Sequence, residues 1–265
     1  MIDLHAHVLP GVDDGPPDLD AAVALVRAAR AAGTTTIVAT SHVSERYPNR
    51  AESLARAREA LVGALAAAGV DVRIEPGAEI ATGVLGELGP DELAALRLGG
   101  GPWLLIESPL SSSAGDFELL LEPLWAAGHR IVLAHPERCP AFQREPVRLE
   151  RLVARGALVS VTAAALTGRF GTTVARYCDR LLRDGLVHNV ASDAHGSGDR
   201  GPEIAPHIEA AAEGLDGMAE AAPWFTVEVP EAILTGAPIG GAPVLSERRA
   251  PAWRRLSGSW RFRSR

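Results

Sequence analysis

Short apolar runs alternate with helical patterns through most of the chain. The first run, MIDLHAHV, is strand-like, and the Ala/Val/Leu-rich segment from Asp18 to Gly33 predicts a helix. A β-branched run over 34–40 predicts the next strand, and a helical pattern covers 50–68. Later strand-like runs lie at 70–77, 103–107, 130–135, 157–161 and 186–193.

This alternation predicts an α/β fold. Strands separated by helices of this length form βαβ units and a mostly parallel sheet. About seven strands favour a (β/α) barrel, and a chain of 265 residues suits one such domain. An open, doubly wound sheet is the alternative, because periodicity does not separate the two.

The end of the chain differs from the rest. Residues 246–265 are basic and aromatic and lack helical periodicity. We therefore predict a barrel over 1–245 and a flexible tail over 246–265. The alternative is an arm that binds an acidic surface, membrane headgroups or a neighbouring subunit.

Composition narrows the class of protein. The content of 47% apolar and 22% charged residues is typical of a soluble globular protein. No apolar run approaches the ~20 residues of a membrane span. The opening segment has no signal-like pattern, so we expect a cytoplasmic protein. The net charge of -7 argues against nucleic-acid binding.

Polar side chains close most of the predicted strands. The residues concerned are His5, His7, His42, Glu79, Glu107, His135, Asp193 and His195. Each alone has an ordinary explanation, such as a packed histidine or a solvated glutamate. In a parallel barrel, however, the carboxyl ends of the strands meet on one face. Buried carboxylates there would be costly without a cation, so we predict a metal site.

The ligand types indicate which metals fit. Imidazole and carboxylate without thiolate suit Mn²⁺, Zn²⁺ or Fe. This many candidate ligands predicts two or three ions that share bridging carboxylates. Clustered ions activate water and hold phosphoryl oxygens, which favours phosphate chemistry.

Several motifs resemble those of a known family. They are MIDLHAHVLPGVDDG at the start, IVATSH ending at His42, PGAEI around Glu79, HPER from His135, SDAH ending at His195, and PEAILTGAPI over 230–239. In this order they resemble the PHP (polymerase and histidinol phosphatase) superfamily. More narrowly, they are similar to bacterial capsular and exopolysaccharide tyrosine-protein phosphatases of the CpsB/CapC type. The resemblance covers about residues 1 to 240 and implies a distorted (β/α)7 barrel.

The resemblance also implies three ions, often manganese, and a role for each ligand. His5, His7, Glu79 and Asp193 would hold the first ion. Glu79 would bridge to a second ion held by Glu107 and His135. Asp14, His42 and His195 would hold the third, although the adjacent Asp13 leaves the choice of aspartate open. Arg138 and Arg200 match phosphate-binding positions, the ordinary alternative being surface salt bridges.

The implied activity is hydrolysis of phosphotyrosine by a metal-activated hydroxide, with His195 or Asp193 passing a proton to the leaving phenolate. The implied substrate is the phosphotyrosine-bearing tail of a membrane-bound tyrosine kinase that controls polysaccharide export. We therefore expect a cytoplasmic enzyme that can lie at the inner face of the membrane and can form a homo-oligomer. The segment Val43–Asn49 and Ser41 depart from the family pattern, which leaves the substrate open.

Other activities fit parts of the pattern. A cysteine-based phosphatase needs Cys-x5-Arg, but Glu145 and Asp184 stand six residues after Cys139 and Cys178. A histidinol-phosphatase-like enzyme and a TatD-like nuclease are the metal-dependent alternatives, and a catalytically silent scaffold is a further one. An amidohydrolase with a carboxylated lysine is excluded, because all 26 basic residues are arginine.

Overall fold

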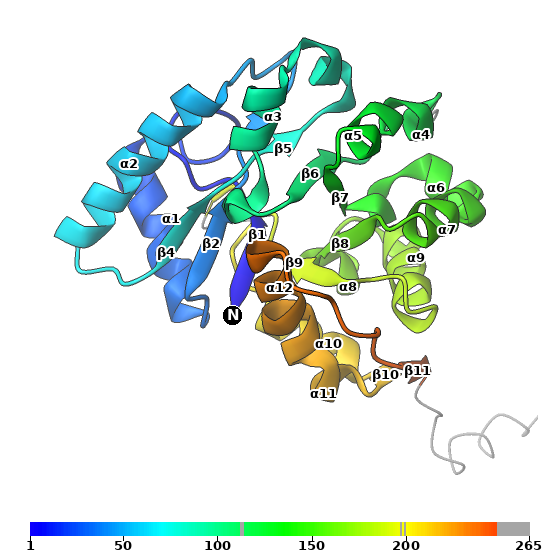
Figure 1. Ribbon diagram of the computed structural model, residues 1–265. Coiled ribbons are helices and arrows are strands. Elements are labelled where there is room, and N and C mark those ends of the chain that lie inside the picture. The colour runs from blue at the N-terminus through cyan, green and yellow to red at the C-terminus, as the bar shows by residue number, and fades with distance from the viewer. Residues whose placement is uncertain (112–113, 197, 199, 248–265) are drawn as a thin grey trace, which may run out of the picture.

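Parallel strands pair in the order of the sequence and close into a barrel (Figure 1). The computed structural model describes residues 1–111, 114–196, 198 and 200–247. The barrel strands are β1 (Ile2–Ala6), β2 (Thr36–Ala39), β3 (His42–Val43), β4 (Arg73–Pro76), β5 (Glu79–Ile80), β6 (Trp103–Glu107), β7 (Arg130–Ala134), β8 (Leu158–Thr162) and β9 (Asn189–Ala191). All their ladders are parallel.

The nine strands occupy seven positions around the barrel, because β3 continues β2 and β5 continues β4 after a short break. One sheet has the order β1-β2-β4, and the other has the order β3-β5-β6-β7-β8-β9. The breaks make the barrel irregular. The predicted distorted (β/α)7 barrel is thereby confirmed.

Contacts between β1 and the end of β9 close the ring. Ala6 bridges Ala194 in parallel register, and the backbone N–H of His7 donates to the Ala194 carbonyl at 2.8 Å. The N–H of Asp193 donates to the carbonyl of His5 at 2.8 Å. Because the first and last strands meet, the open sheet considered from the sequence is excluded.

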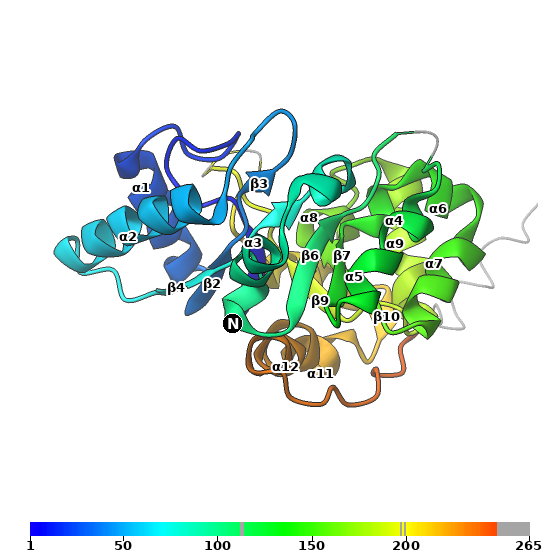
Figure 2. The same ribbon diagram turned by 45° about the horizontal axis from the view of Figure 1, so that its top comes forward.

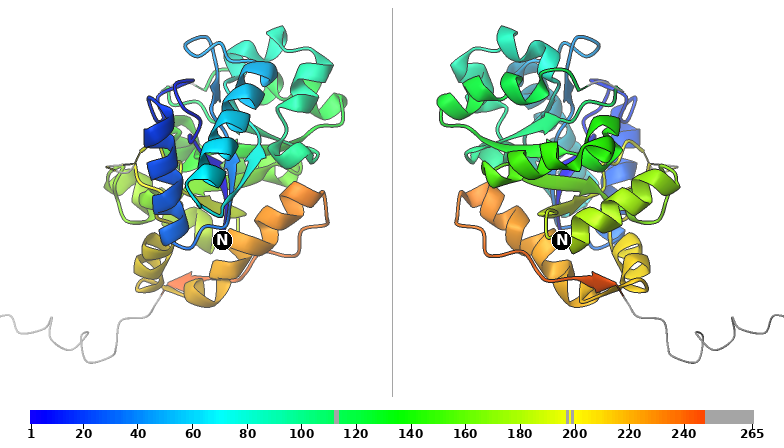
Figure 3. Two further views of the ribbon diagram at one scale, coloured as in Figure 1. Left: turned by 90° about the vertical axis from the view of Figure 1, so that its left-hand side faces the viewer. Right: turned by 90° about the vertical axis from the view of Figure 1, so that its right-hand side faces the viewer.

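Helices cover the outside of the barrel. They are α1 (Leu19–Ala31), α2 (Ala51–Ala67), α3 (Pro90–Ala95), α4 (Phe117–Leu120), α5 (Glu122–Ala126), α6 (Pro140–Arg144), α7 (Pro146–Ala154), α8 (Ala163–Leu166), α9 (Thr172–Arg183), α10 (Ala205–Ala212), α11 (Met218–Pro223) and α12 (Val229–Thr235). Helix α1 begins as predicted, since the Asp18 side chain accepts from the N–H of Ala21 at 2.9 Å. Helices α1 and α2 lie side by side on the β2–β4 side (Figures 1 and 3).

Two apolar layers hold these elements in place. The larger layer packs the helices onto the outer faces of the strands. The smaller layer fills the barrel interior with side chains such as Leu4, Val38, Leu105 and Val132, and Ile233 of α12 packs against them. Helices α11 and α12 lie below the barrel (Figure 2), so α12 covers the end opposite the carboxyl ends of the strands. Only the other end is left for a site built from polar side chains.

The last described residues form a short ladder. β11 (Ser246–Glu247) pairs antiparallel with β10 (Leu215–Asp216). The rest of the predicted tail, 248–265, lies outside the described residues, so the predicted division at residue 245 stays a prediction. None of the helices in the described part of the chain has both the length and the apolar character that a membrane span requires.

We expect the Asp3→Ala change to destabilise the fold by roughly 2–4 kcal/mol, because buried donors would lose their acceptor. The Asp3 carboxylate accepts from the Ser192 hydroxyl at 2.5 Å, from the Ser192 N–H at 3.1 Å and from the His5 N–H at 3.3 Å. Urea unfolding followed by circular dichroism in chelator measures the change. The control is Asp71→Ala, an exposed position before β4. Equal stability of the two variants would contradict this role for Asp3.

Candidate metal centre

The imidazole and carboxylate side chains that close the predicted strands lie together at the barrel mouth. Their ligand atoms form overlapping groups, each within 4.8 Å. The groups are His7, Asp14, His42 and His195; His5, His7 and Asp193; His5, Glu79 and His135; and His42, Glu79 and Glu107. Every predicted ligand is among them. The set predicted for the second ion is divided, since His135 and Glu107 each join Glu79 in a different group.

Glu79 lies at the centre of these groups and is buried. Its Oε2 atom lies 3.3 Å from Nε2 of His5, 3.3 Å from Nε2 of His7 and 3.2 Å from Nδ1 of His42. Within the described residues this oxygen has no hydrogen bond. Its other oxygen, Oε1, is 2.7 Å from Nε2 of His135. An unsatisfied buried carboxylate oxygen facing three ring nitrogens fits a shared cation.

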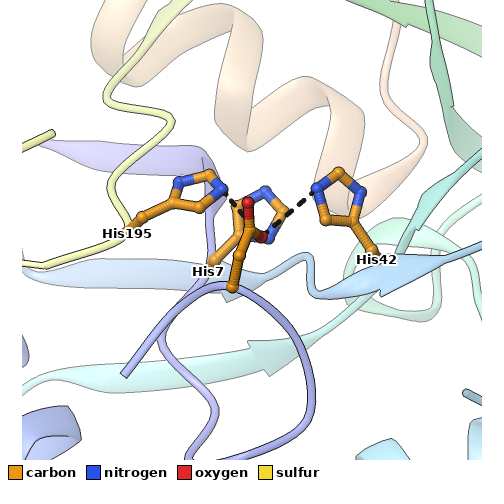
Figure 4. Close-up of side chains that lie close together, drawn as sticks. His7, His42 and His195 are labelled. Carbon is orange, nitrogen blue, oxygen red and sulfur yellow. Dashed lines mark ion pairs between the residues drawn. The ribbon is translucent and has the colours of Figure 1, made fainter. Parts of the chain in front are cut away.

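A second convergence involves Asp14. Its Oδ1 atom lies 3.2 Å from Nε2 of His195 and 3.5 Å from Nε2 of His42. Figure 4 shows the rings of His7, His42 and His195 turned toward one another from different segments of the chain. The His7 and His195 rings stack with centroids 3.8 Å apart. These groups have the donor types and the spacing of a further ion site.

Asp13 and Asp14 have different surroundings. Asp13 belongs to none of the ligand groups; its carboxylate accepts from Nδ1 of His7 at 2.8 Å and from the N–H of His42 at 2.9 Å. A carboxylate behind a ligating imidazole fixes its orientation and tautomer. The N–H of Gly15 also donates to Asp13, and a Cβ at Gly15 would lie 2.7 Å from the His7 carbonyl oxygen. The geometry therefore makes Asp14 the candidate ligand.

The backbone is irregular where it presents these ligands. The β1–β2 register shifts between Asp3 and Ala6, so Leu4 fills the barrel interior while His5 also reaches the mouth. Among the described non-glycine residues, only His135 and Asp193 have positive φ, at 36° and 52°. Such conformations cost roughly 1–3 kcal/mol each and are found at functional sites.

Two arginines share one carboxylate of the cluster. An NH1 atom of Arg138 lies 2.8 Å from Oδ2 of Asp193, and NH2 of Arg200 lies 3.0 Å from Oδ1. The Arg138 guanidinium also lies 4.6 Å from the centroid of the Phe170 ring. Both arginines line the cavity of about 320 Å³ that contains Glu79 and Asp193. Their shared partner is buried, which favours a role at the site over the surface salt bridges that the sequence also allowed.

The electrostatics show how strongly the cluster requires positive charge. Burial alone would lower the pKa of His7, but its hydrogen bond to Asp13 and the nearby charges of Glu79 and Asp13 raise it to about 10. Burial raises the pKa of Glu107, and the nearby Glu79 charge raises it further. The pKa of Glu79 lies well below its usual range, because the charges of His5 and His135 outweigh the effect of burial. Protons on imidazoles balance the carboxylates here, a role that divalent cations fit equally well.

The cysteines do not belong to this centre. Cys139 and Cys178 are both buried, and burial raises the pKa of each thiol. Neither lies in the ligand groups or lines the cavity in the described part of the chain. A reactive thiolate is therefore not part of the described site.

Some residues of the centre were not identified from the sequence. Asp3, the orienting role of Asp13, Tyr47 beside His42, and Phe170 over Arg138 emerge only from the fold. The aspartates carried a usable signal, since both lie close to predicted ligands. Tyr47 and Phe170 carried none, because loop aromatics are common.

Comparison with known proteins agrees with this geometry. Residues 1–222 match the family model described as capsular polysaccharide synthesis, CpsB/CapC. The chain is 35% identical over 198 residues to tyrosine-protein phosphatase YwqE of Bacillus subtilis (strain 168), covering 74% of this chain and 77% of that protein. A crystal structure from work on YwqE of Bacillus subtilis and CpsB of Streptococcus pneumoniae, described as unique metal-dependent tyrosine phosphatases, superposes with a TM-score of 0.80 and 29% identity, covering 94% of this chain and 100% of that one.

A more distant match concerns the fold alone. Dihydropyrimidinase from Brevibacillus agri superposes with a TM-score of 0.51 at 14% identity, covering 93% of this chain and 74% of that one. The likeness places the barrel among a wider set of barrel proteins and says nothing of activity.

We expect Asp14→Ala to lower the number of Mn²⁺ ions bound per chain, because Asp14 faces two ring nitrogens. Asp13→Ala should keep the stoichiometry and weaken affinity about 10- to 100-fold, as loss of an orienting partner does. Elemental analysis after equilibrium dialysis and calorimetry measure the two quantities, with the exposed Asp20→Ala on α1 as control. The reverse result, an ion lost with Asp13 but not with Asp14, would show that the two assignments must be exchanged.

Proposed function

Because the chain belongs to the capsular polysaccharide synthesis, CpsB/CapC, family, we propose that it is a metal-dependent protein-tyrosine phosphatase of the PHP superfamily. The observation that carries this proposal is the position of two arginines in the same cavity as the Glu79-centred ligand cluster. Cations and guanidinium groups on one side of a cavity suit a phosphoryl group.

The donors support a centre of two or three ions. His5, His7 and Asp193, with Glu79 adjacent, would hold the first ion. Glu79 would bridge to a second ion with His135 and Glu107, and Asp14, His42 and His195 would hold a third. Imidazole and carboxylate donors fit Mn²⁺, Zn²⁺ or Fe. Mn²⁺ is our first choice because of the resemblance to the family. When bound, such ions bring the pKa of a water toward neutral and offset charge on phosphoryl oxygens.

Arg138 and Arg200 would bind the phosphoryl oxygens of the substrate. Their planar guanidinium groups each offer paired N–H donors, which match phosphate geometry. The Phe170 ring and Asp193 hold the Arg138 side chain from two sides, so its orientation is set before substrate arrives. Ordered donors lose little entropy on binding, which favours the transition state.

His195 fits a ligand better than a proton donor. Its Nδ1 atom lies 2.9 Å from the Asp193 carbonyl oxygen, an acceptor only, so Nδ1 carries the proton. The Nε2 atom then presents a lone pair toward Asp14. We therefore favour ligation by His195 over the proton transfer that the sequence also allowed.

The proposed substrate is a phosphotyrosine on the tail of a membrane-bound tyrosine kinase, and the proposed role is control of polysaccharide biosynthesis and export. The family description supports a role in polysaccharide synthesis, and the names of the relatives support phosphotyrosine as the substrate. The kinase tail comes from the family resemblance alone. A cytoplasmic enzyme at the inner face of the membrane, in monomeric or homo-oligomeric form, would reach such a tail. A histidinol-phosphatase-like activity is the alternative, and turnover of a phosphotyrosine peptide and of histidinol phosphate side by side separates the two.

We expect a chelator to abolish phosphotyrosine hydrolysis and added Mn²⁺ to restore it. The Cys139→Ser and Cys178→Ser variants should retain activity, because the mechanism uses no thiolate. Release of inorganic phosphate from a phosphotyrosine peptide measures the activity. Turnover that persists after exhaustive chelation would eliminate the metal-dependent mechanism.

We expect Arg138→Ala to lower kcat/KM for the peptide roughly 10²- to 10³-fold, the usual effect of losing one donor to a transition-state oxyanion. Inhibition by inorganic phosphate should weaken in parallel. The control is Arg151→Ala on the exposed face of α7. If both variants behave alike, Arg138 does not bind phosphate.

A further inference from the structure

A tyrosine ring lies beside the ligand cluster without belonging to it. Tyr47 lies in the connection between β3 and α2, which contributes Ser44, Arg46 and Tyr47 to the lining of the cavity. Its ring is within 8° of parallel to the His42 ring, with centroids 5.6 Å apart. The Arg46 guanidinium carbon lies 5.1 Å from the Tyr47 ring centroid.

The loop holds Tyr47 by hydrogen bonds. The N–H of Tyr47 donates to the Ser44 hydroxyl at 3.1 Å, and its carbonyl accepts from the N–H groups of Ser44 at 3.0 Å and Asn49 at 2.7 Å. The Asn49 side chain donates in turn to the carbonyls of His42 at 2.8 Å and Val12 at 2.9 Å. These bonds tie the loop to the strand end and to the Asp13–Asp14 segment. Tyr47 therefore has a defined position at the cavity wall.

The composition of the cavity gives Tyr47 a distinct chemical character. Among the described residues that line it, Tyr47 and Leu110 are the only ones whose side chains are mainly hydrocarbon. The rest of the lining is charged or polar. Leu110, which follows β6, is 47% exposed. A substrate with a phosphoryl group at the arginines and an apolar body has its carbon contacts here.

We propose that Tyr47, together with Leu110, forms the binding site for the aromatic ring of an aryl phosphate and so selects phosphotyrosine over alkyl phosphomonoesters. The inference rests on the proposed phosphatase function, because it places the phosphoryl group at Arg138 and Arg200. An aromatic pair in such a site increases affinity about twofold to tenfold. Arg46 stacks on the Tyr47 ring and supports its orientation.

The test compares two phosphonates that the enzyme cannot hydrolyse. Calorimetry on the full chain loaded with Mn²⁺ gives the Kd of phenylphosphonate and of methylphosphonate. The wild-type protein should prefer phenylphosphonate by about twofold to tenfold, and Tyr47→Ala should remove that preference. Tyr47→Phe keeps the ring and is the matched control, so it should retain the preference.

Metal content, measured in the same samples, shows whether Tyr47 contacts the substrate ring or instead holds the metal ligand His42 in place. Unchanged metal content with loss of the phenyl preference supports the inference. A phenyl preference that survives in Tyr47→Ala overturns it, as does an equal loss of affinity for both probes accompanied by loss of metal. Neither probe is hydrolysed, so the binding result does not depend on catalysis. If the protein does not hydrolyse phosphotyrosine, the proposed function is wrong, but the measured preference for the phenyl ring remains valid.

Discussion

The burial of the Glu79 carboxylate is the constraint on which the rest of the structure depends. A buried negative charge must be balanced by nearby positive charge or be neutralised. The groups that lower the pKa of Glu79 are the imidazoles of His5 in β1 and of His135 at the end of β7. Those segments are far apart in sequence and meet only because the barrel is closed. Closure of the barrel is therefore what supplies the groups that balance the buried Glu79 charge.

The positions of these ligands require local departures from regular structure. A register shift in β1 and left-handed backbone at His135 and Asp193 all occur at the ends of strands that carry ligands. Below them the barrel interior is filled by apolar side chains, with α12 covering its far end. The free energy gained by packing the apolar interior thus offsets the cost of the unusual backbone at the ligand-bearing strand ends.

Periodicity was enough to predict the strands and the α/β class, and residue type pointed to the candidate ligands at the strand ends, because these depend on short-range pattern. Periodicity left the open sheet as an alternative to the barrel, and Asp14 was included only through the family resemblance. What the sequence left open depends on the direction of side chains in loops. Asp13 and Asp14 are adjacent, and only the path of the loop past Gly15 shows which one faces the imidazoles. The structure is likewise needed to see that Glu107 and His135 join Glu79 in two different ligand groups. It is also needed to see that Tyr47 contacts His42.

The joint between β1 and β9 has a consequence for biosynthesis. Asp3 and Ser192, which bond across it, are 189 residues apart in the chain. The first ligands therefore leave the ribosome long before Asp193, and the centre cannot assemble on a nascent chain that lacks its last strand. Until then β1 presents an unpaired edge, which such intermediates are prone to pair wrongly. The two ligand groups that include Asp193 or His195 can therefore form only after the last strand has been made.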